Sequence, residues 1–258
     1  MIPAEHRHPD ESSWNIVSCA AGGATWAALV LFTFGIGLLI AIPVVFLLWL
    51  MSGVLRAQLL GNAVRIGPAQ HPEVHREVVA LCVELGIEPP QVFVMSGSGL
   101  LNAFALKFLG RGGSHVLLMS ELVDLFLERD RPQELRAVIA HELAHHALGH
   151  VDPKMVLLRL PSQFFPFLHQ AYSRSCELSC DRVALAVVGK ADPVRTALLS
   201  LATGSRALSS ATSAESFVRQ SQDGGGFFNF LATIYSTHPL LTVRVEAVTA
   251  RAAELGIS

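Results

Sequence analysis

Residues 136–150, RAVIAHELAHHALGH, hold side chains at a spacing that can bind a metal ion. His141, Glu142 and His145 form the pattern H-E-x-x-H. On a helix, residues four apart differ by about 40° around the axis, so both imidazoles project from one face and can bind the same zinc ion. Glu142 can reach a water molecule on that metal and act as its general base. The motif therefore predicts a zinc site that activates water for hydrolysis.

Two further histidines in this stretch do not fit the same site. At about 100° per residue, His146 lies about 140° and His150 about 180° around the helix from His141. Neither can ligate the same ion unless the helix breaks, so we expect them on the surface or behind the ligands. The extended pattern H-E-x-x-H-x-x-G-x-x-H is excluded, because Leu148 and Val151 occupy its Gly and His positions.

A third metal ligand must come from elsewhere, since a catalytic zinc usually has three protein ligands and one open position for water. The segment 171–186, AYSRSCELSCDRVALA, offers Glu177 and Asp181 four residues apart on one helix face. If Glu177 ligates zinc, Asp181 can accept a hydrogen bond from a ligating imidazole and fix its tautomer. The apolar neighbours argue against a solvated face. His169 is a weaker candidate for the third ligand.

The elements that must position these residues are mostly helical. Apolar periodicity, Pro and Gly signals predict a helix within residues 71–90 that ends at Gly86, and further helices over residues 131–148, 153–167, 171–188, 192–203 and 239–255. QVFVM (91–95) and SHVLLM (114–119) read as short strands, whereas LNAFALKFL between them is compatible with strand or helix. The prediction is a mostly α domain carrying a small β-sheet (α+β).

An uncharged run precedes this domain. The chain is 51% hydrophobic and 16% charged, against about 25% charged in typical soluble domains. Residues 14–55 contain no Asp, Glu, Lys or Arg, and the run is about twice the roughly 20 residues that one span requires. We favour two spans with a turn near Thr33–Gly37 over one span at Trp26–Leu50 behind an interfacial segment. A cleaved signal peptide and a buried soluble helix are disfavoured by this length.

The predicted organisation is a tail at 1–13, a transmembrane region at 14–55 and a catalytic domain at 56–258. Arg56 and Arg65 follow the apolar run closely, so the positive-inside tendency puts the catalytic domain in the cytoplasm. The net charge of −2 and the absence of a basic block give no indication of a nucleic-acid partner. The four cysteines show no zinc-ribbon spacing and read as core residues of a reducing compartment.

The succession H-E-x-x-H, then E-x-x-x-D on a later helix, resembles the M48 family of integral-membrane zinc metallopeptidases. Asn102-Ala103-Phe104-Ala105 is similar to the family's N-A-F-A segment, and His238, Pro239 and Arg244 stand as in its H-P-x-x-x-x-R element. AYSRSCELSCDR is similar to a short bacterial branch. The elements occur in family order over roughly residues 65–250, and together they are specific.

The resemblance implies a gluzincin-type zinc metallopeptidase domain after N-terminal transmembrane helices, with one Zn²⁺ per chain. It further implies an endopeptidase at a bacterial inner membrane, whose partners are the lipid bilayer and protein or peptide substrates, membrane proteins among them. Residues 102–105 and Arg244 would contact the substrate. His238 would stabilise the oxyanion, although it could instead cap the helix that follows Pro239.

The sequence departs from the pattern of one branch of the family in the segment between the zinc helix and the third ligand. HtpX-like members carry membrane helices between the zinc helix and the third ligand, whereas here VLLRLPSQFFPFL (156–168) is broken by Arg159, Pro161 and Pro166 and is not a span.

A catalytically silent membrane scaffold is one alternative function, which the intact Glu142 argues against. The other is metal-dependent hydrolysis of a non-peptide amide or ester, because the zinc chemistry is the same.

Overall fold

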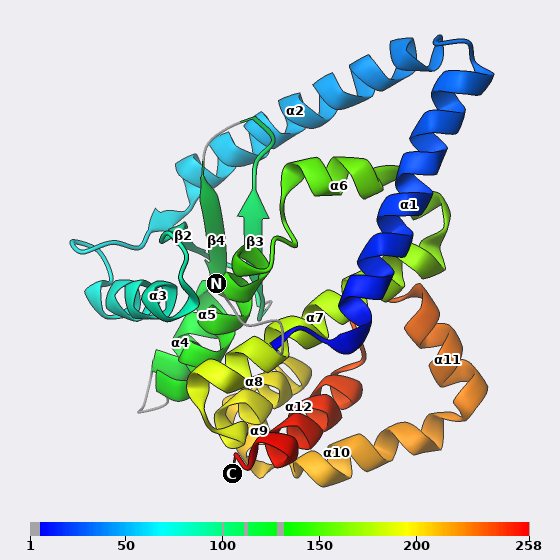
Figure 1. The fold of residues 1–258 in the computed structure, drawn as a ribbon. Coiled ribbons are helices and arrows are strands. Elements are labelled where there is room, and N and C mark those ends of the chain that lie inside the picture. Colours follow the sequence, from blue (N-terminus) through cyan, green and yellow to red (C-terminus); the bar gives the residue numbers. More distant parts are fainter. Residues whose placement is uncertain (1–5, 100, 111–112, 128–131, 258) are drawn as a thin grey trace.

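The chain folds into a helical domain with one small sheet, beneath a long helical hairpin (Figure 1). The computed structural model describes residues 6–99, 101–110, 113–127 and 132–257. The predicted fold class is confirmed. The helices are α1 Pro9–Phe32, α2 Gly37–Asn62, α3 Pro72–Leu85, α4 Ser120–Leu127, α5 Pro132–Ala147, α6 Pro153–Arg159, α7 Pro166–Val188, α8 Ala191–Thr203, α9 Arg206–Ala211, α10 Ala214–Gln220, α11 Gly226–Tyr235 and α12 Leu241–Leu255. The described residues also include the 3₁₀ turns η2 Leu160–Phe164 and η3 Ser221–Gly224.

The sheet has four strands in the order β1-β2-β4-β3. Strands β2 (Gln91–Met95) and β4 (Ser114–Met119) are parallel and have the predicted bounds. The ambiguous segment between them is β3 (Ala103–Lys107), which pairs antiparallel with β4 and forms one edge of the sheet. The other edge, β1 (Val64–Arg65), is too short for a sequence pattern to reveal.

The core lies between the sheet and the helices α3, α5, α7, α8 and α12. On α3, the apolar stripe predicted from the sequence is buried, and Gly86 ends the helix in the left-handed conformation that glycine adopts at no steric cost. On α5, Ala140 and Ala144 are fully buried and leave room for close helix packing. Three of the four free cysteines are buried, as expected for core residues.

Helices α1 and α2 form the hairpin favoured by the sequence. Phe34 and Gly35 adopt positive φ angles of 50° and 87° in the turn that reverses the chain. Among the described residues, these two helices are long and apolar enough to cross a membrane. Most of the large apolar side chains along α2 are exposed, as expected for a helix that faces lipid. The structure begins α1 at Pro9 and ends α2 at Asn62, so the hairpin extends beyond the predicted region 14–55 at both ends.

Two stretches differ from the expected helices. Residues 153–167, expected to be one helix, form α6, the 3₁₀ turn η2 and the start of α7, because Pro161 and Pro166 interrupt regular helix. This link is therefore not a span, as predicted, and α6 lies beneath the arch of α1 and α2 (Figure 1). Residues 206–235 form α9, α10 and α11, which weak periodicity did not reveal.

Candidate metal centre

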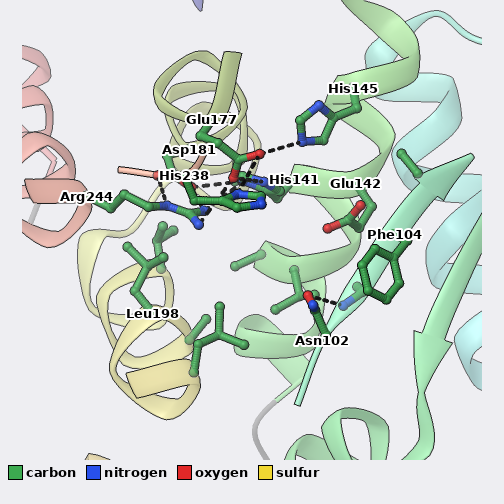
Figure 2. A pocket seen from close by; sticks show the side chains of 18 of the residues that line it. Asn102, Phe104, His141, Glu142, His145, Glu177, Asp181, Leu198, His238 and Arg244 are labelled. Carbon is green, nitrogen blue, oxygen red and sulfur yellow. Dashed lines mark hydrogen bonds and ion pairs between the residues drawn. The ribbon is translucent and has the colours of Figure 1, made fainter. Parts of the chain in front are cut away.

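Helix α5 presents the H-E-x-x-H residues to a pocket of about 260 Å³ (Figure 2). His141 and Glu142 are 9% and 8% exposed, so both are nearly withdrawn from solvent while they line the pocket. His145 lines it one turn later. The helical spacing therefore brings these three side chains to one site, as the motif predicted.

Helix α7 brings Glu177 against both histidines. One carboxylate oxygen, Oε2, lies 3.4 Å from Nε2 of His141, and Oε1 lies 3.5 Å from Nε2 of His145. Burial opposes the charge on Glu177, but the contacts with His141 and His145, with His238 and with Arg244 outweigh it and hold its pKa well below the usual range. An ionised carboxylate thus faces two imidazole nitrogens inside the pocket.

Asp181 supports His141 from behind. Its Oδ1 lies 2.9 Å from Nδ1 of His141, the nitrogen opposite the one that faces Glu177. Burial opposes a charge on His141, but its contacts with Asp181 and Glu177 prevail and raise its pKa to about 10. Asp181 thus lies where the sequence predicted, behind a ligand candidate, and can fix the orientation of that ring.

Arg244 on α12 is engaged by carboxylates. Its Nε and Nη2 donate to the two oxygens of Asp181 at 2.8 and 2.7 Å, and Nη1 lies 3.3 Å from Oε2 of Glu177. The residue is 7% exposed. The sequence resemblance implied that Arg244 contacts the substrate. Its guanidinium group is instead buried and bound to both carboxylates, which favours a role for Arg244 in positioning Asp181 and Glu177.

The donor set fits a catalytic zinc ion. Two imidazole nitrogens and one carboxylate are typical ligands, with a fourth position left for water on the pocket side. His141, His145 and Cys180 form another group, whose ligand atoms lie within 4.8 Å of one another. Cys180 is fully buried and does not line the pocket, whereas Glu177 does. Because a catalytic ion needs an accessible position, we favour Glu177 as the third ligand.

His169, the weaker candidate for the third ligand, does not reach the site. It lies eight positions before Glu177 on α7, which is about 12 Å along the helix axis at 1.5 Å per residue. It does not line the pocket either.

His238 reaches the pocket from the segment before α12. Its Nδ1 lies 3.3 Å from Oε1 of Glu177, and its side chain is 66% exposed. The contact with Glu177 outweighs the effect of burial and raises the pKa of His238. The alternative role as a helix cap is not supported, because α12 has Leu240 at its N-cap and no side-chain cap bond. His238 can therefore offer an N–H to a group bound in the pocket.

The edge strand β3 forms another wall of the pocket. Residues 102–105 line it, and Figure 2 shows Glu142 between His145 and this strand. Met119 donates its backbone N–H to the carbonyl of Asn102, so the alternation of an antiparallel ladder turns the backbone groups of Ala103 and Ala105 away from β4. The N–H of Ala103 accordingly meets its neighbour's side chain, Oδ1 of Asn102, at 2.9 Å.

The two remaining histidines of the motif are partly or fully buried. His146 places Nε2 2.9 Å from the carbonyl oxygen of His115 and so connects α5 to β4. Burial lowers the pKa of His146 to about 4. His150 lies behind the site with Nδ1 3.1 Å from Nδ1 of His145, because α5 ends at Ala147 and Gly149 turns the chain back at φ 78°. Of the two positions expected for His150, the structure shows the one behind the ligands, and the end of the helix brings the residue there.

Glu11 is a neighbour of the site that sequence reasoning missed. It is 1% exposed, and its Oε1 lies 3.2 Å from Nε2 of His150. No local pattern distinguishes it from Asp10, which stands beside it and is exposed.

Comparison with known proteins agrees with this geometry. The model described as "Peptidase family M48" matches residues 68–169 and 155–252. A similar curated protein is the "Plastoglobule-localized metallopeptidase 48, chloroplastic" of Arabidopsis thaliana, which is 25% identical over 215 residues, covering 73% of this chain and 59% of that protein. The chain thus corresponds to less than two thirds of that relative's length. No solved structure matches. Because the family match extends from residue 68 to residue 252 and so covers more than half of the chain, the chain belongs to peptidase family M48.

Proposed function

We propose that the protein is a membrane-anchored zinc endopeptidase. The observation that supports this most strongly is the convergence of His141, His145 and Glu177 beside Glu142 in a pocket with an open strand edge. Family membership and the name of the chloroplast relative agree with a metallopeptidase.

His141, His145 and Glu177 would hold the zinc ion. When bound, zinc lowers the pKa of a coordinated water towards about 7 and polarises the scissile carbonyl. Glu142 accepts the proton of the attacking water and passes it to the leaving amine. His238 faces the same pocket and donates to the oxygen on which charge develops. Asp181 and Arg244 keep His141 and Glu177 in place.

We propose that substrate binds as an added strand on β3. The outward backbone groups of Ala103 and Ala105 can pair with an extended peptide, and main-chain pairing of this kind suits a protein or peptide substrate. Ala105→Pro removes one N–H donor on the pocket side and should raise KM for a peptide substrate several-fold. Ala105→Gly, which keeps the N–H, is the matched control. Equal KM values for the two variants would contradict strand pairing.

Metal removal tests the activity itself. We expect the purified full chain to cleave casein or a tagged membrane protein, to lose cleavage in the presence of a chelator, and to regain it on addition of zinc. A catalytically silent scaffold would cleave nothing in either state. Cleavage of small esters or amides without cleavage of any polypeptide would support the non-peptide hydrolase instead.

We propose that the α1–α2 hairpin crosses a bacterial inner membrane twice and leaves the peptidase domain in the cytoplasm. Arg56 near the end of α2 and Arg65 beyond it support this orientation. A reporter that fluoresces only in the cytoplasm should therefore light up in bacterial cells whether it is fused after Ser258 or before Met1. A dark fusion before Met1 alone would indicate a single span, and a dark fusion after Ser258 would overturn the orientation.

A further inference from the structure

The first apolar helix contributes a buried carboxylate to the surroundings of the metal centre. Glu11 belongs to the first turn of α1, yet it is 1% exposed and lies against the peptidase domain. Its Oε1 pairs with Arg7 and lies 3.2 Å from Nε2 of His150. Burial of a carboxylate is costly unless it is paired, so this placement calls for a reason beyond membrane anchoring.

The contact continues from His150 to a ligand candidate. Nδ1 of His150 lies 3.1 Å from Nδ1 of His145, and the two rings meet edge to face. Nε2 of His145 is the nitrogen that lies 3.5 Å from Glu177. Glu11, His150 and His145 therefore form a chain of three side chains that ends on the nitrogen of His145 opposite its metal-binding side.

One arrangement of protons along this chain leaves Nε2 of His145 free to bind a metal ion. A neutral imidazole has one N–H donor and one acceptor nitrogen. If His150 carries its proton on Nε2, which faces Oε1 of Glu11 at 3.2 Å, its Nδ1 is an acceptor and can take the Nδ1–H of His145. That leaves the lone pair of His145 on Nε2, where a zinc ion would bind. Cys180, with Sγ 3.5 Å from the same Nδ1 of His150, is only a weak competing donor.

Several contacts fix α1 against the domain, so the position of Glu11 is well defined. The backbone N–H of His8, just before the helix, donates to Oγ of Ser179 at 2.8 Å, and Oδ1 of Asn15 accepts from Arg159 at 2.8 Å. At Gly22, a Cβ atom would lie 2.3 Å from the carbonyl oxygen of Leu158, so any larger residue would force α1 away from α6. The described part of the predicted tail, residues 6–13, therefore contacts the domain through His8 and Glu11.

We propose that Glu11 is a positioning residue of the metal centre, which fixes the tautomer and ring orientation of His145 through His150. It does for His145 what Asp181 does for His141, but from the membrane hairpin rather than from α7. The inference rests on the zinc site of the proposed function. It makes metal binding depend on the seating of α1, so the peptidase domain and its anchor form one unit.

Zinc affinity of the full chain in detergent tests the proposal. Glu11→Gln keeps the shape of the side chain but removes its charge, and we expect it to weaken zinc binding about 10- to 100-fold in competition with a chelator, as is typical for partners of ligating histidines. The absorption spectrum of the cobalt-substituted protein should change as well, because the ring of His145 reorients. Asp10→Asn removes an exposed neighbouring charge without touching His150, so this variant should bind zinc as the wild type does.

A double-mutant cycle separates positioning from simple docking. His150→Ala should weaken zinc binding by a similar factor, and Glu11→Gln should then cost nothing further, because its effect passes through His150. Additive losses, or a Glu11→Gln affinity within about twofold of wild type, would overturn the proposal. A wild-type protein that binds no zinc would overturn the proposed function and, with it, this inference. If the protein binds zinc and Glu11→Gln leaves the zinc affinity unchanged, the inference alone would be overturned.

Discussion

Glu142→Gln is expected to abolish peptide hydrolysis while zinc binding persists. The Glu142 side chain lines the pocket between the metal-ligand candidates and strand β3, where the attacking water must lie (Figure 2). Glutamine has nearly the same shape but cannot accept the proton of that water. General base catalysis is typically worth about 10²- to 10⁴-fold, so kcat should fall by that factor.

The measurement combines metal analysis with hydrolysis of the same polypeptide substrate. Glu134→Gln is a matched control, because it makes the same exchange in the first turn of α5. It should leave both metal content and activity unchanged. Activity of Glu142→Gln within about tenfold of wild type, at equal metal content, would show that another group takes the proton.

The parts of the structure that the sequence predicted well are those set by local spacing. H-E-x-x-H on a helix fixes where two imidazoles point, because the geometry of four residues decides it. The second pair, Glu177 and Asp181, follows the same rule. Strands β2 and β4 carry runs of apolar residues bounded by Gly and Ser, and their bounds agree with the prediction.

The parts that could not be predicted depend on contacts distant in sequence or on where a helix stops. A helical wheel placed His150 opposite His141, but the wheel applies only while the helix continues, and α5 ends at Ala147. Glu11 meets His150 across most of the chain, and no periodicity links the two residues. The buried pairing of Arg244 with Asp181 likewise depends on tertiary structure, since a sequence motif does not tell whether an arginine faces substrate or carboxylates.

The identity of the third ligand is open to a direct test, because two side chains on α7 compete for it. Glu177 faces the pocket with Oε2 3.4 Å from Nε2 of His141 and Oε1 3.5 Å from Nε2 of His145. Cys180 is fully buried on the side of His150. The geometry therefore predicts opposite results for substitutions at these two positions.

Glu177→Ala should lose stoichiometric zinc, and Cys180→Ala and His146→Ala should keep it. Alanine leaves Arg244 with one carboxylate fewer, which can destabilise the fold, so Glu177→Gln is made beside it to preserve the volume. With the charge gone, glutamine should also bind zinc far more weakly, and circular dichroism should show that the helices persist. Metal analysis of the purified full-length variants decides the matter. Stoichiometric zinc in Glu177→Ala together with its loss in Cys180→Ala would make Cys180 the third ligand, and the open position of the ion would then have to be sought on the side of His150.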